Sequence, residues 1–406
     1  MSRSVVITGA GAISCFGLGL GPLREALRGG APRLTEVERP AGYHRSRGAR
    51  LAALVGAQDL GAWLPPGSGR RMSPPSRFAV AAANMALRSA SLEGDRAGAD
   101  TAVFLSTTFG PASFSEKLYR SIVTEGPATA SPFLFTECVA NAPAAQVAIA
   151  CGATGVSVTN VQREAGALVA LGRGASEVAS GRTSRALVGV VDELPPLAHA
   201  TLDRYRALAR ATSRGAETAR PFDRRRNGFI ASEGATVLLL EEEEAALARG
   251  ARLLARLRAF GGAFDASAPR AGWGTGVAPL RDGLLRVLQR AGLRPCDLSL
   301  VVSGASGSVT GDRLEARVLR SVFTDVLLPK VLAPKGVTGE YGGGFLASVV
   351  LAAERSPFGP TAGFQETDPE LGIVPHAGGV LPPGGLLLAL SLASGGSASW
   401  VVLETP

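Results

Sequence analysis

The sequence is poor in the residues that build metal and disulfide sites. Its 406 residues include only four cysteines and three histidines. The cysteines stand far apart, without a CxxC pair: Cys15, Cys138, Cys151 and Cys296. This spacing excludes a disulfide framework and a zinc site, so we predict small, buried cysteine side chains in a reducing compartment. The histidines, at positions 44, 199 and 376, are too few and too scattered for a metal cluster, so we expect no metal.

Lysine is also rare, occurring only at Lys117, Lys330 and Lys335, and the formal net charge of +8 comes from arginines spread along the chain. No run of five or six basic residues occurs, and aromatic residues are not interleaved with the arginines. This pattern argues against a nucleic-acid groove. A generally basic surface favours an acidic protein partner instead.

The sequence lacks a long hydrophobic run. No uninterrupted apolar stretch reaches the ~18 residues that a membrane span needs, so we expect no membrane partner. The first residues, MSRSVVITGAG, enter a strand pattern at once, which predicts that no signal peptide is present. Together these features predict a soluble, cytoplasmic protein.

Apolar residues make up 46% of the sequence, and their spacing alternates between strand and helix patterns. Strands are predicted at residues 5–8, 101–106, 156–161, 184–191, 235–240, 298–303, 385–391 and 399–404. Helices are predicted from residue 72, from about residue 141, and at residues 167–181, 280–292, 313–323 and 344–353. Two halves with the same strand–helix order, residues 1–250 and 251–406, predict an α/β fold within one compact unit.

The stretch TGAGAIS, residues 8–14, invites a nucleotide-binding interpretation. We reject it because the glycine spacing is incomplete and no acidic residue ends a second strand at the expected distance. None of the four tyrosines has a lysine four residues later. We therefore expect no cofactor. Gly9 and Gly11 are expected to follow the first strand, at residues 5–8, and to lead to a turn through Phe16 and Gly17.

Residues 220–251 read RPFDRRRNGFIASEGATVLLLEEEEAALARGA. This stretch resembles the mid-chain signature of the β-ketoacyl synthases, R-P-F-D-x-x-R-D-G-F-V-x-G-E-G-A followed by a strand and a helix. Ten of the sixteen positions from 220 to 235 match, while Asn227 and Ser232 depart from it. The resemblance implies a thiolase-like five-layer αβαβα fold made of two pseudo-repeated halves.

The same resemblance assigns the positions at which the family carries its catalytic residues. Counting from Ala153-Thr154-Gly155, the nucleophilic cysteine position falls on Glu164. The family motif G-D-x-x-E-A, matched at residues 311–316, places the first histidine position on Gly304. Lys335 matches the family lysine, and the second histidine position falls on Glu340. The gating phenylalanine position is Ser394.

At these positions the sequence lacks the family's cysteine, both histidines and the gating phenylalanine, so no catalytic residue but Lys335 matches. A loss of this kind resembles the chain-length factor, or KSβ subunit, of type II polyketide synthases. These subunits commonly carry E-Q-A-G-G where this sequence has R-E-A-G-A at residues 163–167. The resemblance implies a heterodimer with a cysteine-containing ketosynthase (KSα), contact with an acidic acyl carrier protein, and a role in setting the length of a polyketide, fatty-acid-like or polyene chain. It also implies that Phe133, Leu134 and Phe135 line the interface and acyl tunnel, and that the strand at residues 156–161 pairs across the two-fold axis.

Glu164, Glu340 and Lys335 are expected to converge, because their family counterparts share one pocket. One interpretation is a salt-bridged plug that fills the former active site. Another is a carboxylate with a raised pKa that acts as a general acid or base. The second would suit a stand-alone acyltransferase or malonyl decarboxylase that acts on a carrier protein, although no histidine remains to stabilise an enolate. A scaffold that binds carrier protein without KSα is a further alternative.

Overall fold

The computed structural model describes residues 3–92, 98–213, 215–379, 381–382 and 384–406. Its main sheet has two five-stranded parts, joined where β1 pairs with β9. The first part, in sheet order, consists of β6 (Ser157–Asn160), β5 (Thr101–Ser106), β7 (Arg185–Asp192), β8 (Gly234–Glu242) and β1 (Val5–Ser14). The second consists of β11 (Lys330–Leu332), β10 (Leu298–Ser303), β14 (Leu386–Leu392), β15 (Ser397–Glu404) and β9 (Ala255–Phe264).

Both parts have the same topology. Counting only the strands of each part in chain order, the sheet order is third, second, fourth, fifth, first. In both parts the fifth strand pairs antiparallel with its two neighbours, whereas the second, third and fourth strands run parallel. This repetition confirms the predicted α/β fold of two pseudo-repeated halves.

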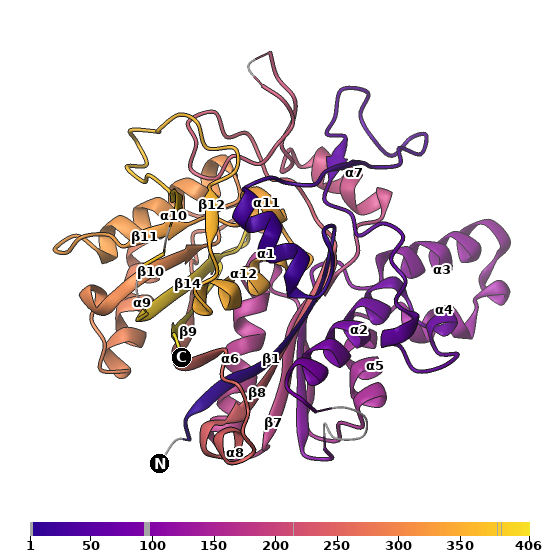
Figure 1. The fold of residues 1–406 in the computed structure, drawn as a ribbon. Coiled ribbons are helices and arrows are strands. Elements are labelled where there is room, and N and C mark those ends of the chain that lie inside the picture. Colours follow the sequence, from indigo (N-terminus) through magenta and orange to yellow (C-terminus); the bar gives the residue numbers. More distant parts are fainter. Residues whose placement is uncertain (1–2, 93–97, 214, 380, 383) are drawn as a thin grey trace.

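Helices cover both faces of both parts and give the fold five layers (Figure 1). The outer helices of the first half are α2 (Pro74–Ser89) and α5 (Ala142–Cys151), and those of the second half are α9 (Val277–Arg290) and α10 (Val309–Val322). The middle layer contains α6 (Gly166–Ala179) and α12 (Gly344–Ala353). One hydrophobic cluster joins α6 and α12 to strands of both halves, and separate clusters lie under each outer layer.

The remaining elements lie at the ends and edges of these layers. The helices are α1 (Leu20–Gly29), α3 (Ala112–Glu125), α4 (Pro132–Glu137), α7 (Pro196–Arg204), α8 (Glu243–Ala248) and α11 (Lys335–Thr338). The short strands are β2 (Gly17–Leu18), β3 (Thr35–Glu36), β4 (Leu51–Ala52), β12 (Phe358–Pro360) and β13 (Ala377–Gly379). The 3-10 turns are η1 (Gly61–Trp63), η2 (Gly69–Arg71), η4 (Pro127–Thr129), η5 (Arg163–Ala165) and η6 (Pro295–Asp297).

The predicted strands and helices are all present, most within a few residues of their expected ends. The sequence patterns missed α1, α3, α4 and α7 in the first half, and β9, β11 and α11 in the second, together with the short strands at the edges. No described helix is both long and apolar enough to cross a bilayer. The division of the chain at residue 250 stays a prediction. The middle-layer helices α6 and α12 share one hydrophobic cluster with strands of both halves, so the packing does not separate the halves at that residue.

The first strand corrects one prediction. The strand was expected to end at Thr8, but β1 continues through both glycines of TGAGAIS to Ser14, and the predicted turn follows it at residues 15–16. A Cβ atom at Gly11 would stand 2.1 Å from the Ala82 carbonyl oxygen of α2, and one at Gly9 would stand 2.2 Å from that of Ala86. The glycines therefore allow α2 to lie directly against the strand.

The cysteines divide into two kinds. Cys15 and Cys151 are buried, and burial raises the pKa of each thiol to about 12. Cys151 is the last residue of α5, and its burial agrees with the prediction. Cys138 is half-buried and Cys296 is exposed, so the prediction of four buried cysteines was wrong. Cys296 lies in η6, on a short surface connection between α9 and β10.

The close contact between β1 and α2 makes Gly11→Ala destabilising. The added methyl group overlaps backbone atoms that cannot rotate away, so the free energy of unfolding should fall by about 1–3 kcal/mol. Gly21→Ala is the matched control, because Gly21 lies exposed in α1 with nothing within 4 Å of its added Cβ. We expect that control to be neutral or slightly stabilising. Urea unfolding followed by circular dichroism measures both changes, and equal effects would contradict the packing argument.

Candidate functional site

Three segments from distant parts of the chain meet around Glu164. The first is η5, which follows β6 and begins α6. The second is the turn between β14 and β15, residues 393–396, which contains Ser394 and is called the gate loop below. The third runs from Lys335 in α11 to Tyr341. The predicted convergence of Glu164, Lys335 and Glu340 is therefore observed, and all three side chains are buried.

Glu164 is held by the gate loop. Its carboxylate accepts hydrogen bonds from the Ser394 amide at 3.1 Å and from the Ser394 hydroxyl at 3.2 Å. Its main-chain carbonyl accepts from the Ser391 hydroxyl at 2.7 Å. Arg163, whose φ of +48° is unusual for a residue with a side chain, donates to the Ser394 carbonyl at 2.9 Å. The position assigned to the family's nucleophile is thus bonded directly to the position assigned to its gate.

Burial and a second carboxylate raise the pKa of Glu164 to about 7. Burial is the larger cause, because it removes the carboxylate from water, and the charge on Glu340 acts in the same direction. Lys335 and the bonds from Ser394 oppose these effects only partly. Glu164 is therefore partly protonated near neutral pH, unlike an ordinary glutamate.

Lys335 forms an ion pair with Glu340 and none with Glu164. The Lys335 ammonium lies 2.5 Å from the Glu340 carboxylate, and it also stands 5.0 Å from the centre of the Phe345 ring. The Glu340 amide donates to the Ile230 carbonyl, and the Ser232 amide donates to the Glu340 carbonyl, both at 2.8 Å. The segment at residues 228–234 therefore fixes Glu340 from the other side.

Tyr341 is a site residue that the sequence patterns missed. Its hydroxyl donates to the Glu164 carboxylate at 3.2 Å. Its ring lies edge-on to Phe109 and Phe229, with ring centres 5.1 and 5.7 Å away. Burial, followed by the neighbouring carboxylates, raises the Tyr341 pKa well above its ordinary value, so the hydroxyl keeps its proton. Its φ of +76° is strained backbone geometry of the kind that clusters at functional sites.

Gly304 directly follows β10 and has no space for a side chain. A Cβ atom there would stand 2.9 Å from the Ser391 Cα and 3.0 Å from the Leu390 carbonyl oxygen. An imidazole at this position would require β14 to move. Nearby, the Asp312 carboxylate accepts from the Phe222 and Ser306 amides at 2.9 and 3.1 Å. The second half's G-D-x-x-E-A motif is therefore bonded to the start of the 220–251 stretch.

Two cavities adjoin Glu164. The outer cavity, of about 510 Å³, opens between the end of α7 and the segment around Trp273. The inner cavity holds only about 20 Å³ and lies against Lys335, Glu340 and Phe345. Arg163, Glu164 and Tyr341 line both cavities. These three residues therefore form a partition that closes the inner cavity from the outer one.

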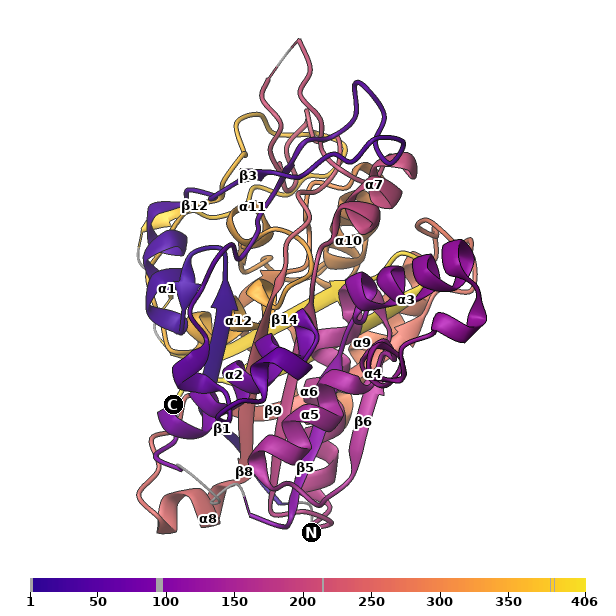
Figure 2. The ribbon, with the colours of Figure 1, turned by 90° about the vertical axis from the view of Figure 1, so that its right-hand side faces the viewer.

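Phe133, Leu134 and Phe135 lie elsewhere, in α4, and line neither cavity. Phe133 is 42% and Phe135 is 62% exposed. They stand on the surface near the exposed edge of the sheet, where Figure 2 shows β6 with α3 and α4 lying above it. Any role for them in a tunnel therefore depends on a second chain.

The part of the chain that the structure describes holds no group of three or more His, Cys, Asp or Glu side chains arranged to bind a metal ion. The chemistry available around Glu164 is that of carboxyl, ammonium, guanidinium and hydroxyl groups. It can bind or transfer a proton, but it contains no thiolate or imidazole.

Comparisons with known proteins agree with this fold. A family model described as the N-terminal domain of beta-ketoacyl synthases matches residues 2–246. The 3-oxoacyl-[acyl-carrier-protein] synthase 2 of Staphylococcus aureus (strain COL) is 28% identical over 393 residues, with 92% of each chain covered. The ishigamide ketosynthase/chain length factor structure is 28% identical, with a TM-score of 0.89 and full coverage of both chains.

A further solved structure is a type II polyketide synthase acyl carrier protein in complex with its ketosynthase. The matched chain is 22% identical, with a TM-score of 0.88 and full coverage of both chains, and it supports the fold alone.

The raised pKa of Glu164 predicts a pH-dependent stability. A carboxyl whose pKa is higher in the folded than in the unfolded state stabilises the fold below pH 4.5, and this contribution is lost as the pH rises through about 7. Glu164→Gln stays neutral at every pH, so it should gain stability relative to the parent between pH 5 and 8, by up to about 3 kcal/mol. The exposed Glu25→Gln is the control. Urea unfolding at several pH values measures the gap, and a gap that does not change with pH would refute the shift.

Proposed function

This chain belongs to the β-ketoacyl synthase family, and we propose that it is a non-condensing subunit that pairs with a cysteine-containing ketosynthase and helps to set the length of the chain that its partner builds. This is the role of a chain-length factor. The observation that carries the proposal is the partition around Glu164. Where the family resemblance places a nucleophilic thiol, this chain has a buried carboxyl group bonded to the gate loop.

The chemistry of condensation supports this proposal. Condensation needs a thiolate that accepts the acyl group, and hydrogen-bond donors that stabilise the enolate of the extender unit. The carboxyl group of Glu164 is not a thiolate, and it is a poor acceptor for an acyl group. At the positions that resemble the two histidines, Gly304 has no space for a ring, and Glu340 would repel an enolate and is already paired with Lys335.

A surface at one edge of the sheet suits a partner subunit. Within the described residues, β6 is the last strand on its side of the sheet and has β5 as its only neighbour. Large apolar side chains are exposed on and around it, which is unusual for a monomer. They are Val156, Val158 and Val161 in or beside β6, and Ile149 in α5, which contacts β6; Val123 and Phe135 are exposed on α3 and α4, the helices that Figure 2 shows above β6.

This surface continues to the gate loop. Arg163 lies two residues after Val161 and donates to Ser394. On the other side of the loop, a Cβ atom at Gly396 would stand 3.3 Å from the ring of Phe264, which is 63% exposed. A partner that pairs with β6 would therefore meet the loop that closes Glu164. We propose that the active partner's acyl chain grows along this shared interface.

The ishigamide ketosynthase/chain length factor supports the type of partner, because this chain matches it over its full length. A carrier protein would deliver substrate to the partner's cysteine. The net charge of +8 on this chain favours an acidic carrier protein nearby.

The pairing is tested by co-expression with ketosynthases from the same genome that carry the cysteine and both histidines. Native mass spectrometry should show a one-to-one complex with one of them. Val158→Asp places a charge in the middle of the proposed interface and should weaken the complex at least about tenfold. Val374→Asp, at a more exposed valine that lies outside β6 and its neighbouring helices, should not. A stable homodimer that ignores every candidate ketosynthase, or condensation by this chain alone, would refute the proposal.

One observation favours a second function. The Glu164 carboxyl, with its pKa raised to about 7, stands at the floor of the outer cavity, where a general acid or base would be useful. A stand-alone acyltransferase or malonyl decarboxylase predicts release of labelled CO2 or acyl transfer from malonyl carrier protein by this chain alone. Glu164→Gln should then abolish turnover while leaving the circular dichroism spectrum unchanged. Absence of turnover in the parent protein excludes this second function and does not count against the chain-length-factor role.

A further inference from the structure

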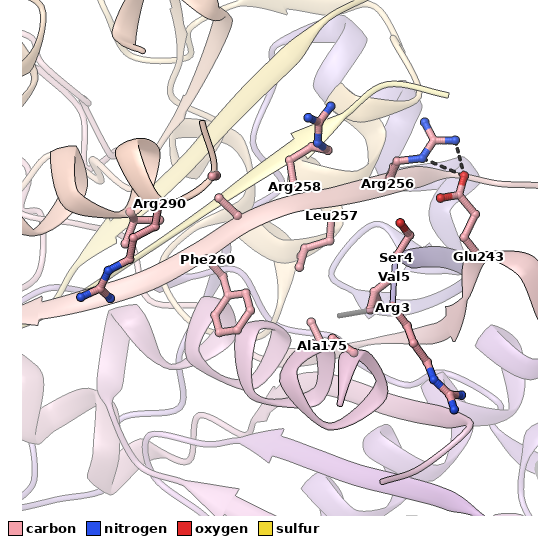
Figure 3. A pocket seen from close by; sticks show the side chains of 14 residues that line it. Arg3, Ser4, Val5, Ala175, Glu243, Arg256, Leu257, Arg258, Phe260 and Arg290 are labelled. Atoms are coloured by element: carbon pink, nitrogen blue, oxygen red, sulfur yellow. Dashed lines mark hydrogen bonds and ion pairs between the residues drawn. The ribbon is translucent and has the colours of Figure 1, made fainter. Parts of the chain in front are cut away.

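A groove of about 660 Å³, larger than the outer cavity, opens on another part of the molecule. It lies between β9, α6, the end of α9 and the start of β1 (Figure 3). None of its lining residues belongs to either of the cavities next to Glu164. The function proposed above therefore leaves this groove unexplained.

The groove faces the edge of a strand. β15 pairs with β9 from Arg256 to Phe264, but β1 pairs with it only at Ala255–Leu257 on the other side. The Arg3 amide donates to the Ala179 carbonyl, and the Ser4 carbonyl accepts from the Glu243 amide, so both residues turn away from β9. In the part of the chain that the structure describes, residues 258–264 have no strand neighbour on this side.

The lining residues confirm that the groove is centred on this edge and not on one face of the sheet. Leu257 packs with the middle-layer core, whereas Ala259 packs with the outer core of the second half. Phe260 stands over Gly172 of α6 and is 38% exposed. An unpaired edge of this kind offers a row of main-chain donors and acceptors to an added strand.

Arginines surround the groove. Arg3, Arg256, Arg258 and Arg290 line it, against one acidic lining residue, Glu243. Glu243 binds Arg256, while Arg3 and Arg258 pair with glutamates outside the lining at 2.8 and 3.0 Å. Arg290 forms no ion pair with any described residue. Figure 3 shows the four side chains spread around the groove, pointing in different directions. They do not converge on one point, as a site for a single small anion would require.

We propose that the free edge of β9 receives an extended acidic segment of a partner protein as an added strand. Its main chain would pair with residues 258–264, its carboxylates would lie beside Arg258 and Arg290, and an apolar side chain would cover Phe260. Charge complementarity selects this occupant. A second copy of this chain, paired edge to edge, would bring arginines against arginines. Charged residues can also serve only to keep an edge unpaired, and in that case no acidic strand binds.

The probe is a fluorescein-labelled eight-residue peptide that alternates glutamate and valine, added to the full-length protein. Two control peptides separate the causes of binding. One carries lysine in place of glutamate, and the other keeps the glutamates but has N-methyl groups on alternate amides, which block strand pairing. Fluorescence anisotropy gives the affinity, and hydrogen exchange with mass spectrometry locates the site. We expect binding of the first peptide only, with slowed exchange at residues 258–264.

Substitutions test the charges. Arg290→Glu should weaken binding about tenfold, because it places a like charge beside the peptide's carboxylates. Arg281→Glu is the control, since Arg281 lies in the same helix but does not line the groove. Several results would overturn the proposal: no binding, equal binding of the N-methylated peptide, protection elsewhere in the chain, or complete competition by pyrophosphate. The last would identify a small-anion site in place of a strand site.

Discussion

The close approach of two backbone segments, residues 228–234 and 339–343, organises the site and joins the two halves. Gly234 has a φ of +138°, and a Cβ atom there would stand 2.2 Å from the Ile13 carbonyl oxygen and 3.0 Å from that of Gly342. A Cβ atom at Gly342 would stand 2.5 Å from the Glu233 carbonyl carbon. Because neither segment carries a side chain at these points, their main chains can bond directly through Ser232 and Glu340. The 220–251 stretch is therefore a structural junction first.

This junction determines where the charges can lie. Glu233 reaches away from it and accepts hydrogen bonds from the Val55 and Leu194 amides at 3.0 and 3.1 Å. Glu340 is directed inward to Lys335, and Tyr341, in its strained conformation, is directed to Glu164. Buried carboxyl groups of this kind are costly unless each has donors. The site meets that need with backbone amides, hydroxyls and one lysine, which makes it well satisfied and closed.

The regular elements that are buried on both sides were predictable from the sequence. The bounds expected for β5, β10 and α12 match those observed, because each is a continuous apolar run with clear ends. β9 was missed because two arginines and two glycines interrupt its apolar residues, so no continuous hydrophobic run marks the strand. β1 was cut short because glycine usually interrupts a strand, and only the backbone of α2 explains why it does not here.

The sequence predicted which residues meet at the site, but it predicted their ion pairs and hydrogen bonds only in part. Family resemblance brought Glu164, Lys335 and Glu340 together, but it could not show that Lys335 pairs with Glu340 alone. The bond from Ser394 to Glu164 spans 230 residues of sequence, so no local pattern contains it. Tyr341 gave no signal at all, since its importance depends on a positive φ that a tyrosine rarely adopts.

The middle layer has a consequence for synthesis on the ribosome. Its core combines Leu168 and Leu171 of α6 with residues as late as Val401 and Leu403 of β15. Chains emerge from the N-terminus, so α6 is made more than two hundred residues before the strand that covers its second face. During that interval its apolar side is open to water and to other nascent chains. The native middle-layer core closes only when β15 has left the exit tunnel, so folding of the first half waits for synthesis of the second.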